Sequence, residues 1–496
     1  MIDGMTSALR STWIARALRL SVLCATVLFA SPPVSAQQGA LSLDRDGKAA
    51  ISALAERFWR ARPATQFEAW DAEVRAAILA DAEALGRLPD RRLEEIVELL
   101  WAPVSEFGPG VPKSVYVKPE KGKLDKRPKW LPKVGRAPKK GKGKGPKVTL
   151  DTPYGEAWFY LDNAAPGRGL ILGLHGGGEG AGSADEPRGT WQAKDCMGMY
   201  PQGIRLVDDT WNTVHGERFL LTMREIALAH FDVDPDRVYS MGFSMGGSGS
   251  WFMAGRHADL LAGAAPCAGV IMAAPRAQLP SKDDVQSIQH GLIPNVRNLA
   301  MYYFIGLSDT NCMPGTYLYA ADMLDGLRDA DEGGYEKIRF ASYEGVAHEM
   351  PKGEPKGLLK WLPKQTRETF PKTVVWEAAI EPYPQRSSSD LVSRKQKTSF
   401  YWLGCDELTD GQSIRATIRD NVIDLTVSKR RNGVRGLTIY LNDQMIDADQ
   451  SLLVVHDGKQ IYTGQPEPSL AVVLESLDAR VDRRMVFDRK IELGKR

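Results

Sequence analysis

The sequence predicts a mixed α/β protein, in which helices cover both faces of a mostly parallel β-sheet. Three observations favour this fold class. Strand-length apolar runs alternate with helix-length segments between residues 148 and 366, which is typical of a parallel sheet with crossover helices. Residues 37–111 place apolar side chains at helical spacing, and residues 367–496 contain short runs of alternating apolar and polar residues. We therefore expect a helical N-terminal segment and a sandwich-like C-terminal β-domain beside the central sheet.

The composition is that of a soluble globular protein. Apolar residues make up 43% of the chain and charged residues 25%, which are ordinary proportions. The formal net charge of +2 does not indicate a nucleic-acid partner. A length of 496 residues exceeds one ordinary hydrophobic core, so two or three structured regions are expected.

The first 36 residues have the pattern of a cleavable export signal. Several arginines precede a short apolar run, Leu20 to Ala30, and the small-residue sequence Val34-Ser35-Ala36 follows. These are the parts of a secretory signal peptide, and the run is shorter than a membrane-spanning helix needs. We expect a secreted or periplasmic protein with no transmembrane span once residues 1–36 are removed. An uncleaved anchor or a chance apolar helix is the alternative.

Residues 112–147 read as a linker. The stretch "KPEKGKLDKRPKWLPKVGRAPKKGKGKGPK" is rich in Lys, Pro and Gly and has almost no opposing charge. Such a composition cannot bury a core and favours an extended chain. Two interpretations stay open: a solvated spacer, or a contact for an acidic partner such as an anionic surface polymer.

Predicted strands and helices alternate from residue 148. The strands are expected at Ala157–Leu161, Leu170–Leu174, Val238–Met241, Ala264–Cys267, Ala300–Ile305 and Ile338–Tyr343. The helices are expected at Glu217–His230, Ser244–Arg256, Tyr317–Ala330 and Pro355–Trp361. Functional residues of such sheets gather at the carboxyl ends of the strands, so the residues that follow these strands are the candidates for a site.

The helical period is lost after about residue 370. Segments such as "SIRATIRDNVIDLTV" and "SLLVVHDGKQIYTG" alternate apolar and polar residues between turn residues. The sequence "HDGK" predicts a tight hairpin turn. We expect an all-β, sandwich-like domain over residues 367–496, without a metal or nucleotide motif.

A single serine lies in a glycine-rich turn after one of the predicted strands. The sequence Gly242-Phe243-Ser244-Met245-Gly246 joins the strand at Val238–Met241 to a helix. This pattern is a nucleophile elbow: glycines on both sides permit a turn tight enough to lift the serine hydroxyl to the top of the sheet. A glycine-rich turn without catalysis is the alternative.

A serine nucleophile needs a base and an orienting carboxylate. Of the histidines after Ser244, His348 alone follows a predicted strand and enters a loop before a helix. Asp309 follows the preceding strand, in the sequence "FIGLSDTN". We predict that His348 is the base and Asp309 the acid. Asp309 as a turn residue is the alternative, and Asp322 and Asp325 are rival acids inside a predicted helix.

Backbone N–H groups that could hold an oxyanion are predicted at two places. One is the N–H of Met245, at the start of the helix after the serine. The other is in "LILGLHGGGEGAG", where a strand ends in His175, Gly176 and Gly177. This is a Gly-rich loop of the type that supplies the second donor. Gly176 and Gly177 are equal candidates, and His175 is expected to hold the loop. A phosphate-binding loop is disfavoured, because no Gly-Lys-Ser/Thr follows.

These residues occur in the chain order of an α/β-hydrolase, which the sequence resembles from about Tyr154 to Trp361. Within that superfamily, "MYPQGIRLVDDTWN" and "FDVDPDRVYSMGFSMGG" are similar to the exported polyhydroxybutyrate-depolymerase, feruloyl-esterase and acetylxylan-esterase group. The resemblance implies that Ser244, Asp309 and His348 are nucleophile, acid and base, with no metal or organic cofactor. The basic linker and the C-terminal β-domain depart from that group.

The sequence indicates less clearly the roles of four residues before the elbow and the pairing of four cysteines. Trp191, Tyr200, Trp211 and Asn212 are expected on loops before the elbow, where they either line a substrate pocket or pack in the core. Export permits disulfides among Cys196, Cys267, Cys312 and Cys405. We expect a Cys267–Cys312 bridge, with four buried thiols as the alternative.

The predicted function is an exported serine hydrolase that cleaves carboxylic esters through an acyl-enzyme on Ser244, with polymeric and small esters both open as substrates. Two alternatives stay open. One is a serine peptidase of the prolyl-oligopeptidase-like type, which uses the same three residues. The other is a surface-binding protein with an inert hydrolase domain.

Overall fold

The computed structural model describes residues 40–110, 147–152, 155–177, 182–203, 211, 213–271, 293–378, 397–406, 408, 412–428 and 433–494. These residues belong to one compact unit. The predicted export signal, nearly all of the predicted linker and Asn212 lie outside them. No helix in the described ranges is both long and apolar enough to cross a bilayer.

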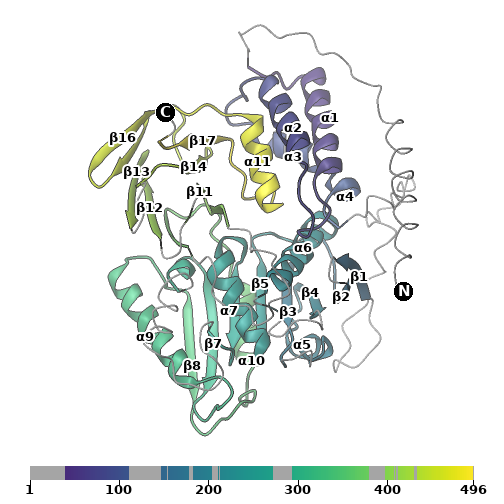
Figure 1. Ribbon diagram of the computed structural model, residues 1–496, viewed down its shortest axis with the longest axis vertical. Helices are drawn as coiled ribbons and strands as arrows, with labels where there is room; N and C mark the ends of the chain where they lie inside the picture. The colour runs from purple at the N-terminus through teal and green to yellow at the C-terminus, as the bar shows by residue number, and fades with distance from the viewer. Residues whose placement is uncertain are drawn as a thin grey trace, which may run out of the picture. The chain divides into compact units, whose positions relative to one another are not determined.

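An eight-stranded sheet organises the middle of the chain, in the order β1-β2-β4-β3-β5-β6-β7-β8 (Figure 1). From β4 to β8 every neighbouring pair is parallel, and β1 and β2 are added antiparallel at one edge. The prediction of a mostly parallel sheet is therefore confirmed. The strands are β1 (Lys147–Thr152), β2 (Gly155–Asp162), β3 (Gly169–Leu174), β4 (Cys196–Gln202), β5 (Val238–Phe243), β6 (Gly263–Cys267), β7 (Ala300–Gly306) and β8 (Ile338–Tyr343).

Two of these strands were not predicted. The sequence of β4, CMGMYPQ, has no β-branched residue and is buried at every position, so neither composition nor alternation marks it as a strand. Tyr200 consequently lies on β4 and not on a loop, which corrects the expectation from sequence. β1 begins at the last residue of the predicted linker.

Helices cover both faces of the sheet (Figure 1). On β3, Leu170, Leu172 and Leu174 join the hydrophobic cluster formed with α6 (Val214–Phe231), α7 (Met245–His257) and α9 (Pro314–Ala330). Ile171 points to the opposite face, into a second cluster that includes Leu358 of α10 (Lys356–Trp361) and residues flanking α5 (Asp185–Thr190). The alternation along a strand thus distributes one short apolar run between two cores.

The C-terminal region contains two smaller sheets. A four-stranded sheet has the order β10 (Ser399–Phe400), β11 (Leu403–Cys405), β14 (Leu437–Leu441) and β17 (Arg489–Glu492). A five-stranded sheet has the order β16 (Lys459–Gly464), β15 (Leu452–His456), β13 (Val422–Ser428), β12 (Ser413–Arg419) and β9 (Thr373–Glu377). The predicted hairpin is present: β15 and β16 are antiparallel, and Asp457 and Gly458 have φ of +49° and +73°. Positive φ at both positions is the geometry that Asp-Gly favours.

This region is not all-β, which corrects the prediction. Residues Leu470–Arg480 form a helix, α11, capped by the Ser469 side chain. Its apolar residues are buried nearly all round, so the sequence shows no clear helical stripe. α11 packs against α2 (Ala72–Ala84) of the N-terminal helices.

The N-terminal segment is helical, as predicted. It consists of α1 (Arg45–Ala61), α2, α3 (Leu93–Trp101) and the single turn α4 (Val104–Phe107). Asp44 and Asp71 cap α1 and α2 by accepting backbone N–H groups. Immediately after α1, Arg62 forms a buried ion pair with Glu225 of α6, with 3.1 Å between nitrogen and oxygen, which joins this segment to the central region.

The cysteine prediction is wrong. Cys196, Cys267, Cys312 and Cys405 are buried thiols. Cys267 and Cys312 belong to different hydrophobic clusters, and the Cys267 Sγ lies 3.5 Å from the carbonyl oxygen of Ala265 on its own strand. Burial raises the pKa of Cys267 well above its ordinary value, so this thiol is a poor nucleophile for disulfide exchange.

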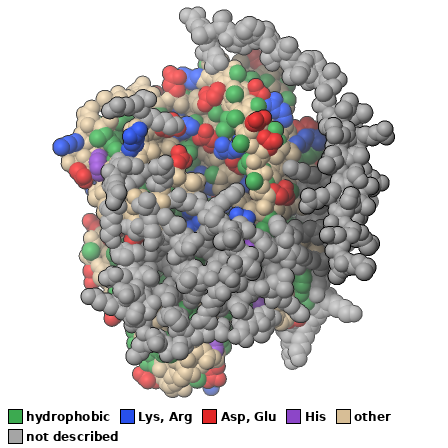
Figure 2. Space-filling model, in the orientation of Figure 1, with side chains coloured by type: hydrophobic (Ala, Val, Ile, Leu, Met, Phe, Trp, Pro, Cys, Tyr) green, Lys and Arg blue, Asp and Glu red, His purple; other side chains and the backbone are tan. Residues whose placement is uncertain are grey.

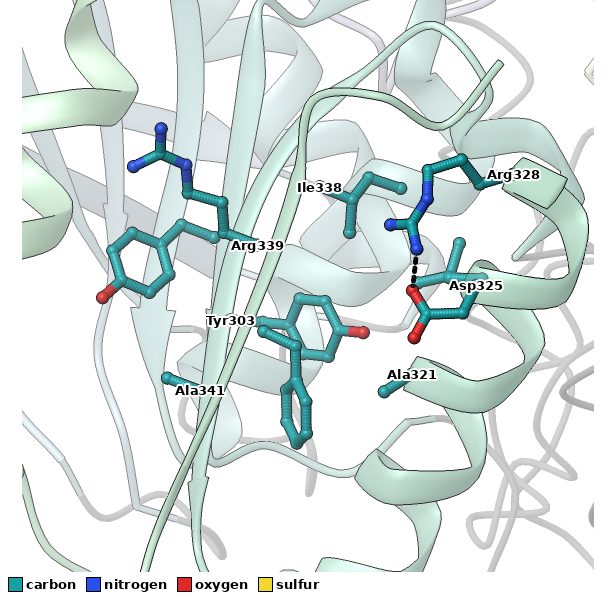
Figure 3. Close-up of a pocket in the computed structure, with 10 residues that line it drawn as sticks. Tyr303, Ala321, Asp325, Arg328, Ile338, Arg339 and Ala341 are labelled. Atoms are coloured by element: carbon teal, nitrogen blue, oxygen red, sulfur yellow. Dashed lines mark hydrogen bonds and ion pairs between the residues drawn. The ribbon is translucent and has the colours of Figure 1, made fainter. Parts of the chain in front are cut away.

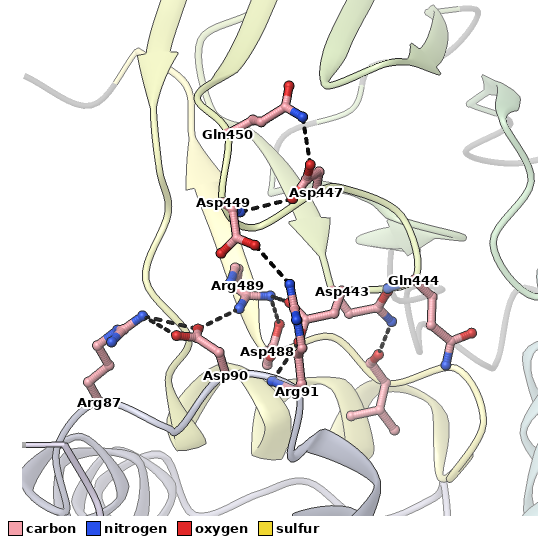
Figure 4. A network of polar contacts seen from close by, with 12 residues as sticks. Arg87, Asp90, Arg91, Asp443, Gln444, Asp447, Asp449, Gln450, Asp488 and Arg489 are labelled. Atoms are coloured by element: carbon pink, nitrogen blue, oxygen red, sulfur yellow. Dashed lines mark hydrogen bonds and ion pairs between the residues drawn. The ribbon is translucent and has the colours of Figure 1, made fainter.

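Among the described residues visible in Figure 2, Lys and Arg side chains are interspersed with Asp and Glu. A denser network lies where Asp90, Asp443 and Asp488 surround one guanidinium, that of Arg489 (Figure 4). Asp90 also pairs with Arg87, at 2.8 Å. Burial, with the neighbouring Asp443 and Asp90 carboxylates, raises the pKa of Asp488 to about 7, against the opposing effect of Arg489.

The raised pKa of Asp488 predicts that the stability of the fold depends on pH in a specific way. Because the folded protein holds this proton more tightly than the unfolded chain does, the stabilisation is complete below the unfolded pKa. It is lost as pH rises from about 4 through about 7. Asp488→Asn should therefore flatten the fall in melting temperature over this range, measured by thermal unfolding. Asp424→Asn, exposed on β13, is the matched control; equal slopes for wild type and Asp488→Asn would contradict the assignment.

Candidate active site

Ser244 occupies a strained turn between β5 and α7. Its backbone has φ of +57° and ψ of −125°, a conformation that costs a non-glycine residue about 1–3 kcal/mol. A Cβ on Gly242 would lie 2.3 Å from the carbonyl carbon of Gly246, and one on Gly246 would lie 2.2 Å from the Leu174 carbonyl oxygen. Both glycines are thus required sterically, as the motif predicts.

The structure brings Ser244, His348 and Asp309 together. The Ser244 Oγ lies 2.8 Å from Nε2 of His348, and Nδ1 of the same ring lies 2.7 Å from Oδ2 of Asp309. A carboxylate accepts only, so Nδ1 carries the proton and Nε2 accepts the serine hydroxyl. His348 is thereby held in the tautomer that can remove a proton from Ser244.

Asp309 is fixed as an acceptor by its own loop. Asp309 is 3% exposed. Its second oxygen, Oδ1, accepts the backbone N–H groups of Asn311 and Cys312 at 2.8 and 2.9 Å. These bonds make Asp309 a turn residue as well as the partner of His348. The rival Asp325 instead pairs with Arg328 on the exposed side of α9.

The histidine loop is anchored by a residue that the sequence analysis did not single out. Glu354 Oε1 accepts the hydroxyl groups of Tyr302 on β7 and Tyr343 on β8, at 2.6 and 3.2 Å. Its Oε2 accepts the N–H of Leu358 at the start of α10. Because Glu354 follows His348 by six positions, these contacts tie the far end of the loop to the two strands that deliver Asp309 and His348. The two tyrosines meet one carboxylate only because β7 and β8 pair, so no local sequence signal identifies Glu354 as an anchor.

The loop predicted to supply an oxyanion donor, called the oxyanion loop below, follows β3 and approaches the serine. A Cβ on Gly176 would lie 3.3 Å from the Ser244 Cβ, and Gly177 has φ of +83°, which favours glycine. His175 holds this loop. Its Nε2 accepts the Gly203 N–H at 2.9 Å, so Nδ1 carries the proton and donates to the Gly176 carbonyl at 2.8 Å. Burial lowers the pKa of His175, which favours this neutral form.

Two of the candidate oxyanion donors, the N–H groups of Gly176 and Met245, differ in their contacts. The N–H of Gly176 donates to Oε2 of Glu186, on α5, at 3.2 Å, a contact that the sequence did not suggest. At the other candidate position, the N–H of Met245 belongs to the first residue of α7, and such N–H groups have no acceptor inside their own helix.

The aromatic residues proposed for a pocket are packed in the core. Trp191, Tyr200 and Trp211 are 1%, 2% and 0% exposed, so the packing interpretation describes them. Tyr200 donates its hydroxyl to the Trp191 carbonyl. Trp211 donates Nε1–H to the His175 carbonyl at 2.9 Å and so supports the oxyanion loop. Asn212 lies outside the described residues.

A cavity of about 500 Å³ lies elsewhere, between α9 and the edge strand β8 (Figure 3). Its walls include Tyr303, Leu324 and Phe340, with Asp325 and Arg328 at the helix side. None of Ser244, His348 and Asp309 lines it, so it is not the space in front of the serine. Within the described ranges, no group of three or more His, Cys, Asp or Glu side chains is arranged to hold a metal ion.

No family model matches the sequence, and no curated protein matches it. Among solved structures, a thermostable esterase is 19% identical, with 45% of this chain and 62% of that chain covered and a TM-score of 0.32. The esterase Est2 of the Planctomycetes species Thermogutta terrifontis, with propionate bound, is 16% identical, with 42% and 87% covered and a TM-score of 0.32. The same organism's esterase 2, phosphonylated by sarin, is 15% identical, with 40% and 83% covered and a TM-score of 0.32. This chain therefore spans less than two thirds of the length of the thermostable esterase.

Gly242→Ala should disable the site while a matched glycine substitution should not. The added Cβ of Gly242→Ala meets backbone atoms of Gly246 at 2.3 Å, so the turn that carries Ser244 must shift. A displacement of this size reduces turnover by about 100-fold or more, measurable with a chromogenic ester.

Gly326→Ala, on α9, is the matched control, because nothing lies within 4 Å of its added Cβ. It should keep full activity and gain up to about 1 kcal/mol of stability. Thermal unfolding of both variants separates a displaced serine from global unfolding. A folded Gly242→Ala protein with wild-type activity would rule out the steric role.

Proposed function

We propose that this protein is a serine hydrolase of the α/β-hydrolase type that cleaves carboxylic esters through an acyl-enzyme on Ser244. The observation that supports it is the unbroken chain of contacts from the Ser244 Oγ to His348 at 2.8 Å and from His348 to Asp309 at 2.7 Å. A buried carboxylate, an oriented imidazole and a hydroxyl on a strained turn are the parts that nucleophilic acyl transfer requires.

Acylation follows from this geometry. The Ser244 Oγ attacks the ester carbonyl carbon while His348 Nε2 takes the hydroxyl proton. The Asp309 carboxylate stabilises the imidazolium that forms. The carbonyl oxygen becomes an oxyanion, which backbone N–H groups at Met245 and in the Gly176–Gly177 loop would hold. The intermediate collapses when His348 returns the proton to the departing alcohol, which leaves the acyl group on Ser244.

Deacylation uses the same residues in reverse. Water donates a proton to His348 Nε2 and attacks the acyl carbon, and the second tetrahedral intermediate forms at the same N–H groups. Its collapse releases the carboxylic acid and returns the proton to the Ser244 Oγ. The balance is one ester and one water consumed for one acid and one alcohol, and no redox partner takes part.

We also propose export and a kinship with the polyhydroxybutyrate-depolymerase, feruloyl-esterase and acetylxylan-esterase group, which makes polymeric esters candidate substrates. The support is the signal-like pattern of residues 1–36 and the sequence stretches around the elbow. The Lys-rich stretch at 112–147 is the candidate contact for an anionic surface polymer. N-terminal sequencing of the protein recovered from the cell exterior tests export, and cleavage after Ala36 is the expected result.

Ser244→Ala should abolish hydrolysis. We expect wild type to cleave p-nitrophenyl acetate and to be labelled by a fluorophosphonate probe. The variant should lose about 10⁴-fold or more in kcat and take no label. A parallel panel of short-acyl, hydroxybutyrate-oligomer, feruloyl, acetyl-sugar and peptide substrates decides the class. Preferential cleavage of the peptides would replace the esterase assignment by a peptidase, and an unlabelled wild type would indicate an inert domain.

Asp309→Asn should be almost as damaging, for a different reason. The amide can present an N–H to His348 Nδ1, which favours the tautomer whose Nε2 is protonated and cannot accept the serine proton. We expect kcat to fall by about 10³–10⁴-fold with little change in KM. Asp322→Asn, an exposed aspartate on α9, should behave as wild type. Equal activities of Asp309→Asn and Asp322→Asn would exclude Asp309 as the acid.

A further inference from the structure

Glu186 contacts the predicted oxyanion loop, although the proposed ester hydrolysis does not itself require a carboxylate there. Its Oε2 accepts the N–H of Gly176, one of the two candidate oxyanion donors, at 3.2 Å. A Cβ built on Gly176 would lie 3.6 Å from this oxygen and 3.3 Å from the Ser244 Cβ. Glu186 thus contacts a glycine that adjoins Ser244, although Glu186 itself lies on α5 and not at the end of β3, β5, β7 or β8.

The helix turn that carries Glu186 is fixed to the sheet through Arg188. Two residues later on α5, Arg188 is fully buried and pairs with Asp162 of β2 through two bonds, at 2.6 and 2.8 Å. Its guanidinium also lies over the Tyr160 ring, 4.3 Å from the centroid. The turn of helix that carries Glu186 is thus fixed to the sheet.

Both polar backbone groups of Gly176 are occupied. Its N–H donates to Glu186, and its carbonyl accepts the Nδ1–H of His175 at 2.8 Å. The carbonyl of Gly176 and the N–H of Gly177 belong to one trans peptide plane and point in opposite directions. Fixing the carbonyl toward His175 therefore turns the Gly177 N–H away from His175. Of the two described glycines, Gly176 and Gly177, Gly177 is then the one whose N–H is left to act as a donor.

The charge of Glu186 is not compensated. Across the described part of the chain, no Lys, Arg or His forms an ion pair with it, and its Oε1 has no hydrogen-bond partner there. Partial burial raises the pKa of Glu186, against the effect of the Gly176 N–H. More than a third of the residue's surface is exposed, so the carboxyl also faces the solvent from which a substrate arrives.

We propose that Glu186 is a positioning residue that holds Gly176, assigns the second oxyanion donor to Gly177, and makes the site reject esters with an anionic group near the scissile bond. The inference rests on the proposed ester hydrolysis. The hydrogen bond accounts for the first two effects, because it orients the loop. The charge accounts for the third, since two anions a few ångströms apart repel in a site partly shielded from water.

Glu186→Gln and Glu186→Ala separate the hydrogen bond from the charge. On neutral p-nitrophenyl butyrate, Glu186→Ala should lose about tenfold in kcat with KM almost unchanged. Glu186→Gln should stay within about twofold of wild type, because its amide oxygen can still accept the Gly176 N–H. On the anionic mono-p-nitrophenyl glutarate, Glu186→Gln should raise kcat/KM relative to the neutral ester by about five- to tenfold.

Asp185→Asn is the matched control, since it removes one charge from the same helix and leaves the Gly176 contact in place. It should keep wild-type kcat on the neutral ester. The rate of fluorophosphonate labelling, whose phosphoryl oxygen enters the same hole, is measured on all four proteins and should fall only for Glu186→Ala. Thermal unfolding shows that each is folded.

The outcomes are distinguishable. A wild-type protein that neither cleaves esters nor takes the label overturns the proposed function, and with it the oxyanion role of this loop. If wild type is active and Glu186→Ala matches it in kcat and labelling rate, the positioning role is wrong and the esterase assignment stands. An unchanged ratio of anionic to neutral ester hydrolysis in Glu186→Gln overturns the proposed charge selection.

Discussion

The positive φ of Ser244 is the constraint on which the rest of the site depends. At +57° the serine points its hydroxyl out of the sheet, and α7 can begin at the very next residue. That conformation persists only because glycines at 242 and 246 let the backbone pass within distances that no side chain would allow. The N–H of Met245, the first residue of α7, follows directly after this turn, so in the proposed reaction the nucleophile and one oxyanion donor come from adjacent residues.

Around this turn, directed polar contacts hold the loops that complete the site. His175 fixes the carbonyl of Gly176, Glu186 fixes its N–H, and Glu354 ties the histidine loop to Tyr302 and Tyr343. Hydrogen bonds suit this task because they specify direction, whereas apolar contacts specify only proximity. In the proposed reaction the imidazole must face the Ser244 hydroxyl and two N–H groups must face the carbonyl oxygen, and both tasks depend on direction.

The terminal regions are bound to the central one through α6. Arg224 of that helix pairs with Asp482 at 2.9 Å, and Arg367 reaches the same carboxylate at 2.8 Å. Arg62 pairs with Glu225 one position along. Nearly every residue of α6 is buried, since the sheet covers one side and these contacts cover the other. Buried pairs of this kind contribute little net energy but are costly to break singly, which favours one relative arrangement of the regions.

The sequence by itself determined the parallel sheet, the hairpin at Asp457-Gly458, the strained elbow and the identity of the residues that meet there. Each rests on a local rule: alternation, a turn geometry that needs glycine, or a residue placed just after a strand. The tertiary structure alone decided the rest. β4 is buried at every position and α11 nearly all round, so their patterns carry no clear period. The core positions of Trp191 and Trp211, the thiol state of Cys267 and the contacts of Glu186 and Glu354 depend on partners distant in the chain. A local pattern records which way a residue faces, and not which residue it faces.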